Sequence, residues 1–510
     1  MVTITEQNFY ATAAILPRYR MPMTEMTSID PLAGSPDLAP QQYRVQRIEH
    51  WNNVARQSDT RRGVGGAYHR RLEEIFGRLV LPGEKVLELG CAQGDLLAAL
   101  EPGYGVGIDF SEEMIARAKH RHPLLHFYVG DVHELSLDQT FDVIILSDLV
   151  NDLWDVQAVL EKIKPLTTPR TRIIFNVFSQ LWQAPLRAAQ KMGLKQPTLS
   201  QNWLAVSDVN NLLYLSGYEM IRHWEEILWP IYTPLIHGLC NKYLVRLWPL
   251  NHGALTNFVI ARVAPEPPPE PEPIVSVIVP ARNEAGNIEA IFARTPEMGG
   301  GTELVFVEGG SSDDTYAAIE REMARHPHRR AKLLRQTGKG KGDAVRVGFA
   351  RASGEVLMIL DADLTVPPES LPLFYEALRS GKGDFVNGVR LVYPMEKQAM
   401  QFLNLAANKM FGMAFTWLLG QPLKDTLCGT KVLLKRDYDR ISANRHYFGE
   451  FDPFGDFDLL FGAAKLNMKM VDVPIRYRQR TYGSTNIQRF RHGLLLLRMV
   501  MFAARRIKFV

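Results

Sequence analysis

Apolar residues recur along the chain in two patterns, and the two patterns alternate. Leu72, Ile75, Phe76 and Leu79 are spaced i, i+3, i+4, i+7, which predicts a helix with one buried face. Between such helical stretches lie short apolar runs that predict buried strands. These runs are 86–89, 105–108, 126–129, 141–146 and 173–177, then 274–279, 303–307 and 356–360. Strands that alternate with helices predict an α/β fold whose ligands bind at the carboxyl ends of parallel strands.

The two sets of strands are separated by the stretch 264–273, which is composed of proline, glutamate and one alanine. Its prolines exclude helix and sheet, so an extended, solvated spacer is expected. The alternative is an exposed loop inside a single domain. We therefore expect two α/β domains joined by a Pro/Glu-rich linker. The expected boundaries are an irregular arm at 1–40, a first domain at 41–263, the linker at 264–273 and a second domain at 274–510.

Composition and charge narrow the functional classes. The chain has 510 residues and a formal net charge of +4, which gives no reason to expect a nucleic-acid partner. Cys91, Cys240 and Cys428 are too far apart for a metal-binding motif or a disulfide framework, so a reducing, cytoplasmic location is expected. No secretory signal and no run of eighteen apolar residues is visible, so no ordinary transmembrane helix is expected.

The first domain carries a glycine-rich turn between a strand and a helix, in the stretch KVLELGCAQGDLLAAL at 85–100. Small residues let the backbone approach a ligand closely, and the helix start presents free N–H groups. The next strand ends at Asp109, about twenty residues on, where a carboxylate can hold ribose hydroxyls. The strand after it leads to Asp131. A dinucleotide-binding domain of another kind is the alternative to a nucleoside site of this type.

With these features the stretch 49–160 resembles the class I S-adenosylmethionine-dependent methyltransferases, which have a Rossmann-like fold. The resemblance implies that S-adenosylmethionine is the cofactor and that Ala92 stands where many members have glycine. The residues it places around the cofactor are Glu88, Gly90, Cys91, Ala92, Gly94, Asp109, Phe110, Asp131 and Val132.

Residues 179–250 are rich in Trp, Leu and Pro and are expected to form a lid or an acceptor-binding insertion. Within them Leu239, Tyr243 and Leu247 share one helical face, while Lys242 and Arg246 stand on another. A surface helix packed on the domain is the favoured interpretation, and a lipid contact is the alternative.

The second domain shows the features of a nucleotide-diphosphate site. Asp361 and Asp363 follow a buried strand, close enough to hold one divalent cation of the Mg²⁺ or Mn²⁺ kind together with diphosphate oxygens. The loop GKGKG at 338–342 adds Lys339 and Lys341 to this region. An isolated Asp-x-Asp is usually a solvated turn, but the stretch PARNE at 280–284 and the basic loop upstream favour the site.

These stretches resemble the family-2 glycosyltransferases of the GT-A fold over residues 274–490. The similarity is greater to the polyprenyl-phosphate sugar transferases, the group that includes dolichol-phosphate mannose synthase, through the stretches 361–369, 387–390, 425–431 and 480–487. Two departures are Glu308-Gly309, where an aspartate pair is usual, and Ser484-Thr485-Asn486. The resemblance implies that the nucleotide sugar contacts Pro280, Ala281, Arg282, Asn283, Glu284, Glu308, Lys341, Asp361, Ala362, Asp363, Arg390 and Arg480, with Asp361 and Asp363 holding metal and Asp363 catalytic.

An acceptor-side acid is expected in the stretch FGDFD at 454–458. Asp458, or its neighbour Asp456, is a candidate general base. The alternative is an acid that only positions a helix N-terminus. A phosphate acceptor, with a second pKa of about 6, would already be ionised and would need no base.

Two stretches suggest contact with a membrane surface. In 397–419 the polar residues Lys397, Gln401, Asn404 and Asn408 form one narrow stripe on an otherwise apolar helix. Near the C-terminus Arg491, Arg498 and Arg505 are heptad-spaced among leucines and methionines. Basic amphipathic helices of this kind bind anionic membranes, so a peripheral position on the inner face of the cell membrane is expected. The alternative is a dimer or interdomain helix.

Together these features predict a bifunctional enzyme of lipid-linked or surface glycan biosynthesis. The second domain would transfer a sugar from a nucleotide-sugar donor to a polyprenyl phosphate with inversion, and the first would methylate an unidentified acceptor. The competing hypotheses are a glycosyltransferase that extends a glycan at a sugar hydroxyl and a first domain that binds without turnover. A homo-oligomer is compatible with the sequence.

Overall fold

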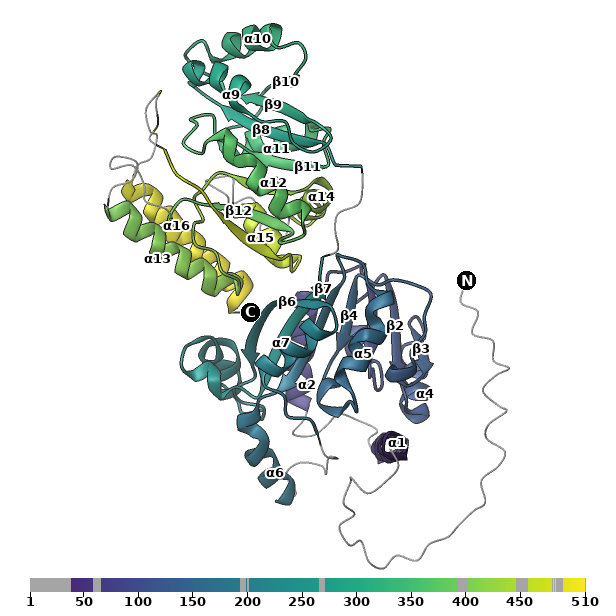
Figure 1. Ribbon diagram of the computed structural model, residues 1–510. Helices are drawn as coiled ribbons and strands as arrows, with labels where there is room; N and C mark the ends of the chain where they lie inside the picture. Colours follow the sequence, from purple (N-terminus) through teal and green to yellow (C-terminus); the bar gives the residue numbers. More distant parts are fainter. Residues whose placement is uncertain are drawn as a thin grey trace, which may run out of the picture.

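The computed structural model describes residues 38–57, 66–192, 199, 201–265, 271–392, 402–445, 457–478, 480, 482 and 489–509. The first half contains one seven-stranded sheet in the order β3-β2-β1-β4-β5-β7-β6 (Figure 1). Its strands are β1 Lys85–Leu89, β2 Tyr104–Asp109, β3 His126–Val129, β4 Val143–Leu146, β5 Arg172–Phe178, β6 Tyr218–Glu226 and β7 Thr256–Val263. Neighbouring strands from β3 to β5 are parallel, and β7 runs antiparallel to both β5 and β6.

Helices cover both faces of this sheet. They are α1 Leu38–Gln57, α2 Gly66–Leu79, α3 Asp95–Ala99, α4 Glu112–Arg121, α5 Val156–Ile163, α6 Gln183–Lys191, α7 Val206–Leu215 and α8 Ile236–Gly238. One core lies around Leu87, Ile144 and Phe175 and a second around Phe76, Ile145 and Phe258. Adjacent residues of β4, Ile144 and Ile145, face opposite cores, as the alternation of side chains along a strand requires.

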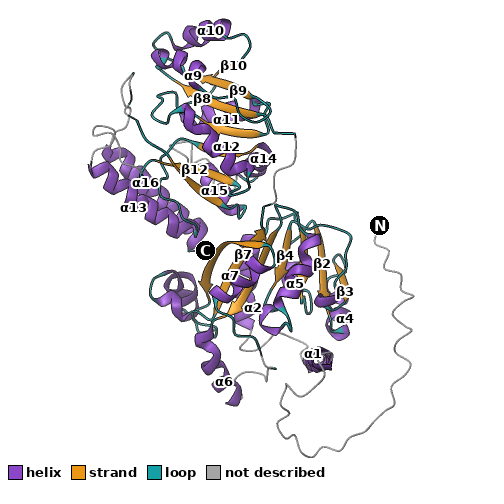
Figure 2. Cartoon of the chain, in the orientation of Figure 1, coloured by secondary structure: helices purple, strands orange, loops and turns teal. Residues whose placement is uncertain are grey.

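The second half contains another seven-stranded sheet, in the order β10-β9-β8-β11-β13-β12-β14 (Figure 2). Its strands are β8 Val275–Ala281, β9 Thr302–Glu308, β10 Arg330–Arg335, β11 Val356–Ile359, β12 Phe385–Val389, β13 Lys431–Leu434 and β14 Met470–Pro474. Only β13 is antiparallel to its neighbours among these described strands. The helices are α9 Ile288–Arg294, α10 Thr315–Arg325, α11 Lys341–Arg351, α12 Leu371–Arg379, α13 Phe402–Leu419, α14 Lys435–Ala443, α15 Phe457–Lys465 and α16 Arg489–Ala503.

The strand order reverses once near the centre of each sheet. In the first sheet the chain runs outward from β1 to β2 and β3, then returns to β4 on the other side of β1. In the second sheet it runs from β8 to β9 and β10, then returns to β11. Such a reversal leaves a crevice at the carboxyl ends of the central strands, where doubly wound sheets bind their ligands.

The expected fold class, two successive α/β domains, is confirmed. All eight apolar runs picked out from the sequence overlap strands. The expected irregular arm at 1–40 lies outside the described residues, except that α1 begins at Leu38. Half of the linker, residues 266–270, also lies outside them, and the domain boundaries stay predictions.

The expectation that residues 179–250 form only a lid or insertion is wrong for part of this stretch. α7 packs on the sheet, and β6 forms its edge beside β7. The sequence of β6, YEMIRHWEE, conceals a strand because the register shifts between Met220 and Arg222 and breaks the alternation of apolar and polar residues.

Residues 239–246 form short helical turns that pack on the domain, in agreement with the favoured interpretation. The face that packs is a different one: Val245 and Arg246 are buried, whereas the apolar face of Leu239, Tyr243 and Leu247 is exposed. Arg246 packs inward because its guanidinium pairs with the buried carboxylate of Glu226, at 2.5 Å.

The two halves are joined by a polar interface between strands of the first sheet and the edge of the second. The Arg172 guanidinium of β5 donates to the backbone oxygen of Asn467 at 2.8 Å and to the carboxylate of Asp384 at 2.6 Å. Arg262 of β7 binds the same carboxylate and the backbone oxygen of Gly381. Both arginines are nearly buried, so Asp384 compensates two charges that water does not reach freely.

A second group of contacts lies around Asn467. Its amide nitrogen donates to the backbone oxygen of Leu79 at 2.8 Å, and its amide oxygen accepts from Arg222 at 2.9 Å. Leu81 of the first half packs into the second half's hydrophobic core. The halves therefore share both a polar and an apolar contact surface.

A tight turn after β1 shapes the crevice of the first sheet. Gly90, Ala92 and Gly94 all have positive φ, at 69°, 46° and 75°. The backbone N–H of Gly90 donates to the oxygen of Ile108 at 2.8 Å, which holds the turn against β2. A Cβ on Gly94 would lie 2.5 Å from a ring carbon of Phe127. This position therefore requires glycine for both its backbone and its close packing.

Replacing Gly94 by alanine is expected to lower the free energy of unfolding of the first domain by about 2–4 kcal/mol, from left-handed backbone strain and overpacking. Denaturant unfolding followed by tryptophan fluorescence measures this loss. Gly77→Ala is the matched control, because no atom lies within 4 Å of a Cβ there. It should stabilise helix α2 by about 0.5–1 kcal/mol. Equal behaviour of the two variants would contradict the described turn.

Cleavage at a protease site inserted within 266–270 is expected to leave two folded halves that still co-elute in size-exclusion chromatography. Each half has its own sheet and core, and the contacts of Asp384 and Asn467 do not depend on the linker. Asp384→Asn should weaken the association of the cleaved halves by about 2–4 kcal/mol, because it removes the carboxylate that buried Arg172 binds and leaves Arg262 with Glu219 alone.

Glu369→Gln is the control for this experiment, since Glu369 pairs with Arg294 on the exposed surface of the second half. Separation of the unmutated halves at micromolar concentration would show that the interface does not hold in solution. Aggregation of both halves would show that neither is an independent domain.

Candidate functional sites

Three acidic side chains of the first half follow successive strands at the reversal of the sheet. Glu88 lies in β1, Asp109 ends β2, and Asp131 follows β3. Parallel strands bring their carboxyl ends to one edge, so these three residues from distant parts of the sequence meet at one crevice.

Asp109 is held in a fixed orientation by two backbone donors. Its Oδ2 accepts from the N–H of Ala92 at 3.0 Å and its Oδ1 from the N–H of Ser111 at 2.9 Å. Burial raises the pKa of Asp109 to about 6, although these two hydrogen bonds favour the ionised form. The carboxylate therefore has lone pairs left for a ligand hydroxyl and changes charge close to neutral pH.

Asp131 and Glu88 are fixed by different partners. Burial alone would raise the pKa of Asp131, but hydrogen bonds from His133 and the charge of Arg44, at 3.1 Å, lower it below its usual value. Because its pKa is lowered, Asp131 is ionised at neutral pH. Glu88 accepts a hydrogen bond from the N–H of Leu97 in α3 at 3.1 Å.

These side chains line a cavity of about 460 Å³. All the residues predicted to surround the cofactor line it except Gly94, which only shapes the turn; those on its wall are Glu88, Gly90, Cys91, Ala92, Asp109, Phe110, Asp131 and Val132. The structure therefore brings these predicted residues to one cavity, and their role in binding the cofactor stays a prediction.

Helix α1 supplies part of the cavity wall that the sequence did not predict. Tyr43, Arg47 and Trp51 line it, and Asp152 from the loop after β4 holds two of them. Arg47 Nε donates to Asp152 Oδ1 at 3.1 Å and Trp51 Nε1 to Asp152 Oδ2 at 3.2 Å. Residues 41–51 have no clear apolar stripe, so periodicity gives no hint of this role. The aromatic residues Tyr43 and Trp51, on the same helix, are the one available clue.

A second group that the sequence missed follows β4. Asp148 has a positive φ of 54° and accepts from the hydroxyl of Tyr68 at 2.7 Å and from the amide of Asn176 at 2.5 Å. Burial, and then the charge of Asp148, raise the pKa of Tyr68 well above its usual value. Asp148 and His69 both line the cavity. They add a carboxylate and an imidazole to its chemistry.

In the second half, the loops that follow β8 and β9 are bound to each other. Asn283, with a positive φ of 57°, accepts from the N–H of Ser312 at 2.8 Å. The N–H of Glu284 donates to Thr315 at 2.9 Å, and Glu308 accepts from the N–H of Ser311 at 2.5 Å. These contacts build one rim of the second crevice from the predicted residues of the stretch 280–284 and Glu308.

The acidic pair lies at the strand reversal of this second sheet, directly after β11. Lys341 at the start of α11 pairs with Asp361 at 2.6 Å. Burial alone would raise the pKa of Asp361, but this ammonium group lowers it. Burial and the neighbouring charge of Asp361 raise the pKa of Asp363, whose Oδ1 accepts two hydrogen bonds from Thr365. One lysine balances the charge of only one of these two neighbouring carboxylates, so the pair can bind a further cation.

Glycine is required beside this pair. A Cβ on Gly429 would overlap both the carboxylate of Asp361 and the ammonium group of Lys341. Gly429 belongs to the stretch 425–431 that the sequence associated with the site, so the structure brings this stretch to the acidic pair. No cluster of three or more His, Cys, Asp or Glu side chains suited to a metal occurs among the described residues.

Arg390 and Arg480, both predicted to contact the nucleotide sugar, are each held by a carboxylate. Arg390 donates from Nε and Nη2 to the two oxygens of Asp425, at 2.7 and 2.9 Å, and its guanidinium lies 5.1 Å from the ring centre of Tyr477. Burial alone would lower the pKa of Arg390, but Asp425 raises it above its usual value. Arg480 pairs with Glu284, so it joins the rim formed by the loop after β8.

The acceptor-side acid is only partly described. Asp458 lies in the first turn of α15 and pairs with Arg445 at 3.1 Å, while Asp456 lies outside the described residues. Ser484, Thr485 and Asn486 lie outside them too. The catalytic role of Asp458 stays a prediction.

Two family models match the chain. A methyltransferase domain model matches residues 81–226, and the glycosyl transferase family 2 model matches residues 276–441. The magnesium protoporphyrin IX methyltransferase of Synechocystis, solved with bound SAH, is 15% identical, with a TM-score of 0.32 over 45% of this chain and 100% of that one.

Curated relatives match the second half. The dolichol-phosphate mannosyltransferase of Pyrococcus furiosus is 30% identical over 42% of this chain and 59% of its own length. The undecaprenyl-phosphate 4-deoxy-4-formamido-L-arabinose transferase of Edwardsiella ictaluri is 27% identical over 45% of this chain and 66% of its own length. The chain thus spans about three fifths of these relatives' length. It joins a methyltransferase domain at residues 81–226 to a glycosyl transferase family 2 domain at residues 276–441.

Proposed function

We propose that this chain is a bifunctional transferase whose second half glycosylates a polyprenyl phosphate and whose first half methylates an acceptor still to be identified. The observation that carries the proposal is the position of Asp361, Asp363 and Lys341 at the strand reversal of the second sheet, in a domain whose relatives are named for transfer to polyprenyl phosphates. The first half contributes a separate cavity at the corresponding place in its own sheet.

The charge of the first cavity favours S-adenosylmethionine over a dinucleotide. Eight acidic side chains line it, Glu73, Glu88, Asp109, Asp131, Glu134, Asp148, Asp152 and Asp155, against the two arginines Arg44 and Arg47. An acidic wall attracts a sulfonium cation and repels a diphosphate. The alternative of a dinucleotide-binding domain is therefore disfavoured.

The residues of the cavity fit the parts of this cofactor. Asp109, oriented by two backbone N–H groups, would accept from the ribose hydroxyls, and Asp131 would lie beside the adenine. The turn at Gly90 lets the backbone approach the amino-acid end. When bound, S-adenosylmethionine supplies an electrophilic methyl group. Asp148 and His69 are the wall residues that we expect to position the acceptor and to take its proton.

S-adenosylmethionine affinity is expected to fall as the pH drops through about 6, by up to tenfold per unit, and to be constant above pH 7. The reason is that ribose hydroxyls donate to the ionised form of Asp109, and burial raises the pKa of this carboxyl to about 6. Asp109→Asn should bind roughly ten- to a hundredfold more weakly, with this pH dependence lost. Isothermal titration calorimetry between pH 5 and pH 8 measures both effects.

Asp138→Asn, an exposed change in the same domain, is the control and should match the unmutated protein. A flat profile in the unmutated protein, or an unchanged profile in Asp109→Asn, would contradict the role of Asp109.

The acidic pair of the second half fits a divalent cation. Asp361 and Asp363 would hold the ion together with diphosphate oxygens of the donor, which is the ligand set that Mg²⁺ and Mn²⁺ prefer. When bound, the ion neutralises charge on the departing nucleotide diphosphate. Lys341 stands at the same place and contributes a fixed positive charge.

The remaining residues of the second site hold the donor and the acceptor. The rim formed by Asn283, Glu284 and Glu308 would surround the base and ribose. Arg390, locked by Asp425, and Arg480 would face phosphate groups. A phosphate oxygen of the lipid then bonds to the anomeric carbon as the bond from that carbon to the diphosphate breaks on the opposite face, with inversion. The phosphate is already ionised, so Asp458 is not needed as a base.

Helices α13 and α16 lie side by side and offer a surface suited to a membrane (Figure 1). Their buried sides pack together through residues such as Phe415 and Met499. Their outer sides expose six large apolar residues, Met410, Met413, Trp417, Leu494, Leu497 and Met501. Arg498, Arg505 and Arg506 are exposed beside them. No described helix combines the length and the apolar run that crossing a bilayer requires.

The first half extends this apolar surface. Between residues 229 and 250 ten large apolar side chains are exposed, among them Leu235 at 91% and Trp248 at 80%. This segment touches α13, because Trp417 Nε1 donates to the backbone oxygen of Arg246 at 3.1 Å, and the ring of Tyr243 lies 5.5 Å from that of Phe509. An apolar surface with basic residues at its edge supports a peripheral position on an anionic membrane.

Membranes that carry the enzyme, incubated with labelled nucleotide sugars and a divalent cation, are expected to place label in an acid-labile lipid extractable with organic solvent. Asp363→Asn should lower this transfer on the order of a hundredfold or more, because it weakens the hold on the cation. Arg480→Ala should lower it as well, and chelator should abolish it. Glu376→Gln, an exposed change on α12, is the control.

Label found only in a growing polysaccharide or in protein would refute the lipid acceptor and favour the hydroxyl-extending alternative. Full activity in chelator would refute the cation. Failure of methyl transfer to every extracted glycolipid, with S-adenosylmethionine still bound, would favour a first half that binds without turnover.

A further inference from the structure

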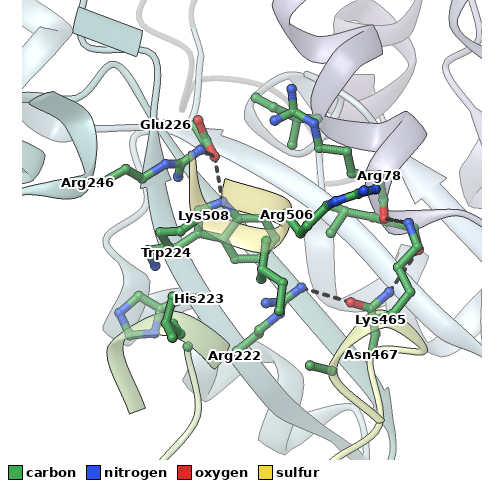
Figure 3. A pocket seen from close by; sticks show the side chains of 16 residues that line it. Arg78, Arg222, His223, Trp224, Glu226, Arg246, Lys465, Asn467, Arg506 and Lys508 are labelled. Carbon is green, nitrogen blue, oxygen red and sulfur yellow. Dashed lines mark hydrogen bonds and ion pairs between the residues drawn. The ribbon is translucent and has the colours of Figure 1, made fainter. Parts of the chain in front are cut away.

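A cavity of about 90 Å³ lies at the interface between the two halves, away from both strand-end sites (Figure 3). Side chains of α2 and β6 from the first half and of α13, α15 and the C-terminal turns from the second half line it. A second cavity of about 280 Å³ adjoins it and shares Trp224, Arg246 and Lys508 with the first. The two cavities are therefore neighbours between the halves.

This space is strongly basic. Six basic side chains line the smaller cavity, Arg78, Arg222, Arg246, Lys465, Arg506 and Lys508, and they come from both halves (Figure 3). Two acidic residues oppose them among the described lining residues, Glu226 in the smaller cavity and Glu225 in the larger. The Glu226 carboxylate pairs with Arg246 at 2.5 Å and with Arg71 at 3.5 Å.

Arg222 has no carboxylate partner among the described residues. Arg222 donates to neutral groups only, the backbone oxygen of Leu419 at 3.3 Å and the amide oxygen of Asn467 at 2.9 Å. The Nε atoms of both Arg222 and Arg246 are buried without a hydrogen-bond partner, and the Arg246 side chain is only 7% exposed. Buried donors of this kind are usually satisfied by an acceptor, so these two N–H groups are suited to the oxygen atoms of an anion.

The charges also act on one another. Burial, then the positive charges of Arg246 and Arg222, lower the pKa of Lys508 to about 8. Burial, then Arg246, lowers the pKa of Arg222 to about 10. Like charges gathered at a shielded interface repel, and a bound anion would relieve that repulsion.

We propose that this interdomain cavity binds a phosphate-bearing anion, which bridges Arg222 and Arg246 of the first half to Lys508 of the second. Phosphate oxygens accept several charge-assisted hydrogen bonds at once, and arginine guanidinium groups match their geometry. The two cavities together have room for a phosphate with a substituent. The anion comes either from a lipid headgroup, since the exposed apolar segment at 229–250 adjoins the site, or from a free phosphate compound.

An anion there couples the two halves. It contacts side chains of both, so its binding free energy adds to that of the interface, and it binds the joined state better than the separated one. The site is independent of the proposed reactions because none of its residues belongs to either strand-end site.

The test uses the full-length chain at pH 7 and constant ionic strength. Calorimetric titration with inorganic phosphate and with pyrophosphate forms one arm. The other is sedimentation with vesicles of phosphatidylcholine alone or mixed with phosphatidylglycerol. Lys508→Gln removes one cation of the site and should weaken binding on the order of tenfold in one arm. Arg506→Gln is a second variant for the phosphate arm, and the exposed change Lys382→Gln is the charge-matched control.

Phosphate or pyrophosphate binding with one site per chain, weakened by Lys508→Gln and unchanged by Lys382→Gln, supports the proposal with a free phosphate compound as ligand. Vesicle binding that needs phosphatidylglycerol and shows the same dependence on Lys508 supports it with a lipid headgroup as ligand. Equal binding by the unmutated chain and Lys508→Gln in both arms, or equal losses in Lys508→Gln and Lys382→Gln, overturns it.

Discussion

The reversal of strand order at the centre of each sheet is the constraint on which both sites depend. Because parallel strands end at the same edge, side chains that follow different strands converge wherever the chain changes direction across the sheet. In the first sheet this brings Glu88, Asp109 and Asp131 together, and in the second it brings the loop after β8 to Asp361. The same topology serves two chemistries because the loops differ. The first crevice is lined by acids, which suits a cationic cofactor, and the second combines acids with Lys341, which suits a metal–diphosphate complex.

The interface between the halves holds the two domains in a defined relative orientation, which a flexible linker alone would not do. Arg172 and Arg262 meet at Asp384, and Arg222 meets Asn467, so the orientation of the halves is set by directional contacts between nearly buried groups. The same interface carries the excess of positive charge around Lys508 and adjoins the exposed apolar segment at 229–250. A polar interface of this kind costs desolvation, which excellent geometry or a bound anion offsets.

Features that a local pattern determines could be predicted from the sequence. Short apolar runs predicted the strands, and the predicted acids lie together at the strand ends, because strand ends and tight glycine turns are fixed by neighbouring residues. Gly94 illustrates this, since its positive φ follows from the turn alone. What the sequence did not yield depends on residues distant along the chain. The role of Tyr43 and Trp51 in the first cavity, the group of Tyr68, Asp148 and Asn176, and the pairing of Arg246 with Glu226 all arise from tertiary contacts. β6 was missed because a shift in register hides its alternation.

We propose that one chain both glycosylates a polyprenyl phosphate and methylates an acceptor, and we expect both products in the lipid-linked fraction. Mass spectrometry of organic-solvent-extractable glycoconjugates from cells with and without the enzyme tests it most directly. The account predicts a polyprenyl-phosphate sugar that is present only with the enzyme, together with a mass difference of one methyl group in that lipid or in a product made from it. An unchanged lipid fraction, with the differences confined to polysaccharide or protein, would contradict the account.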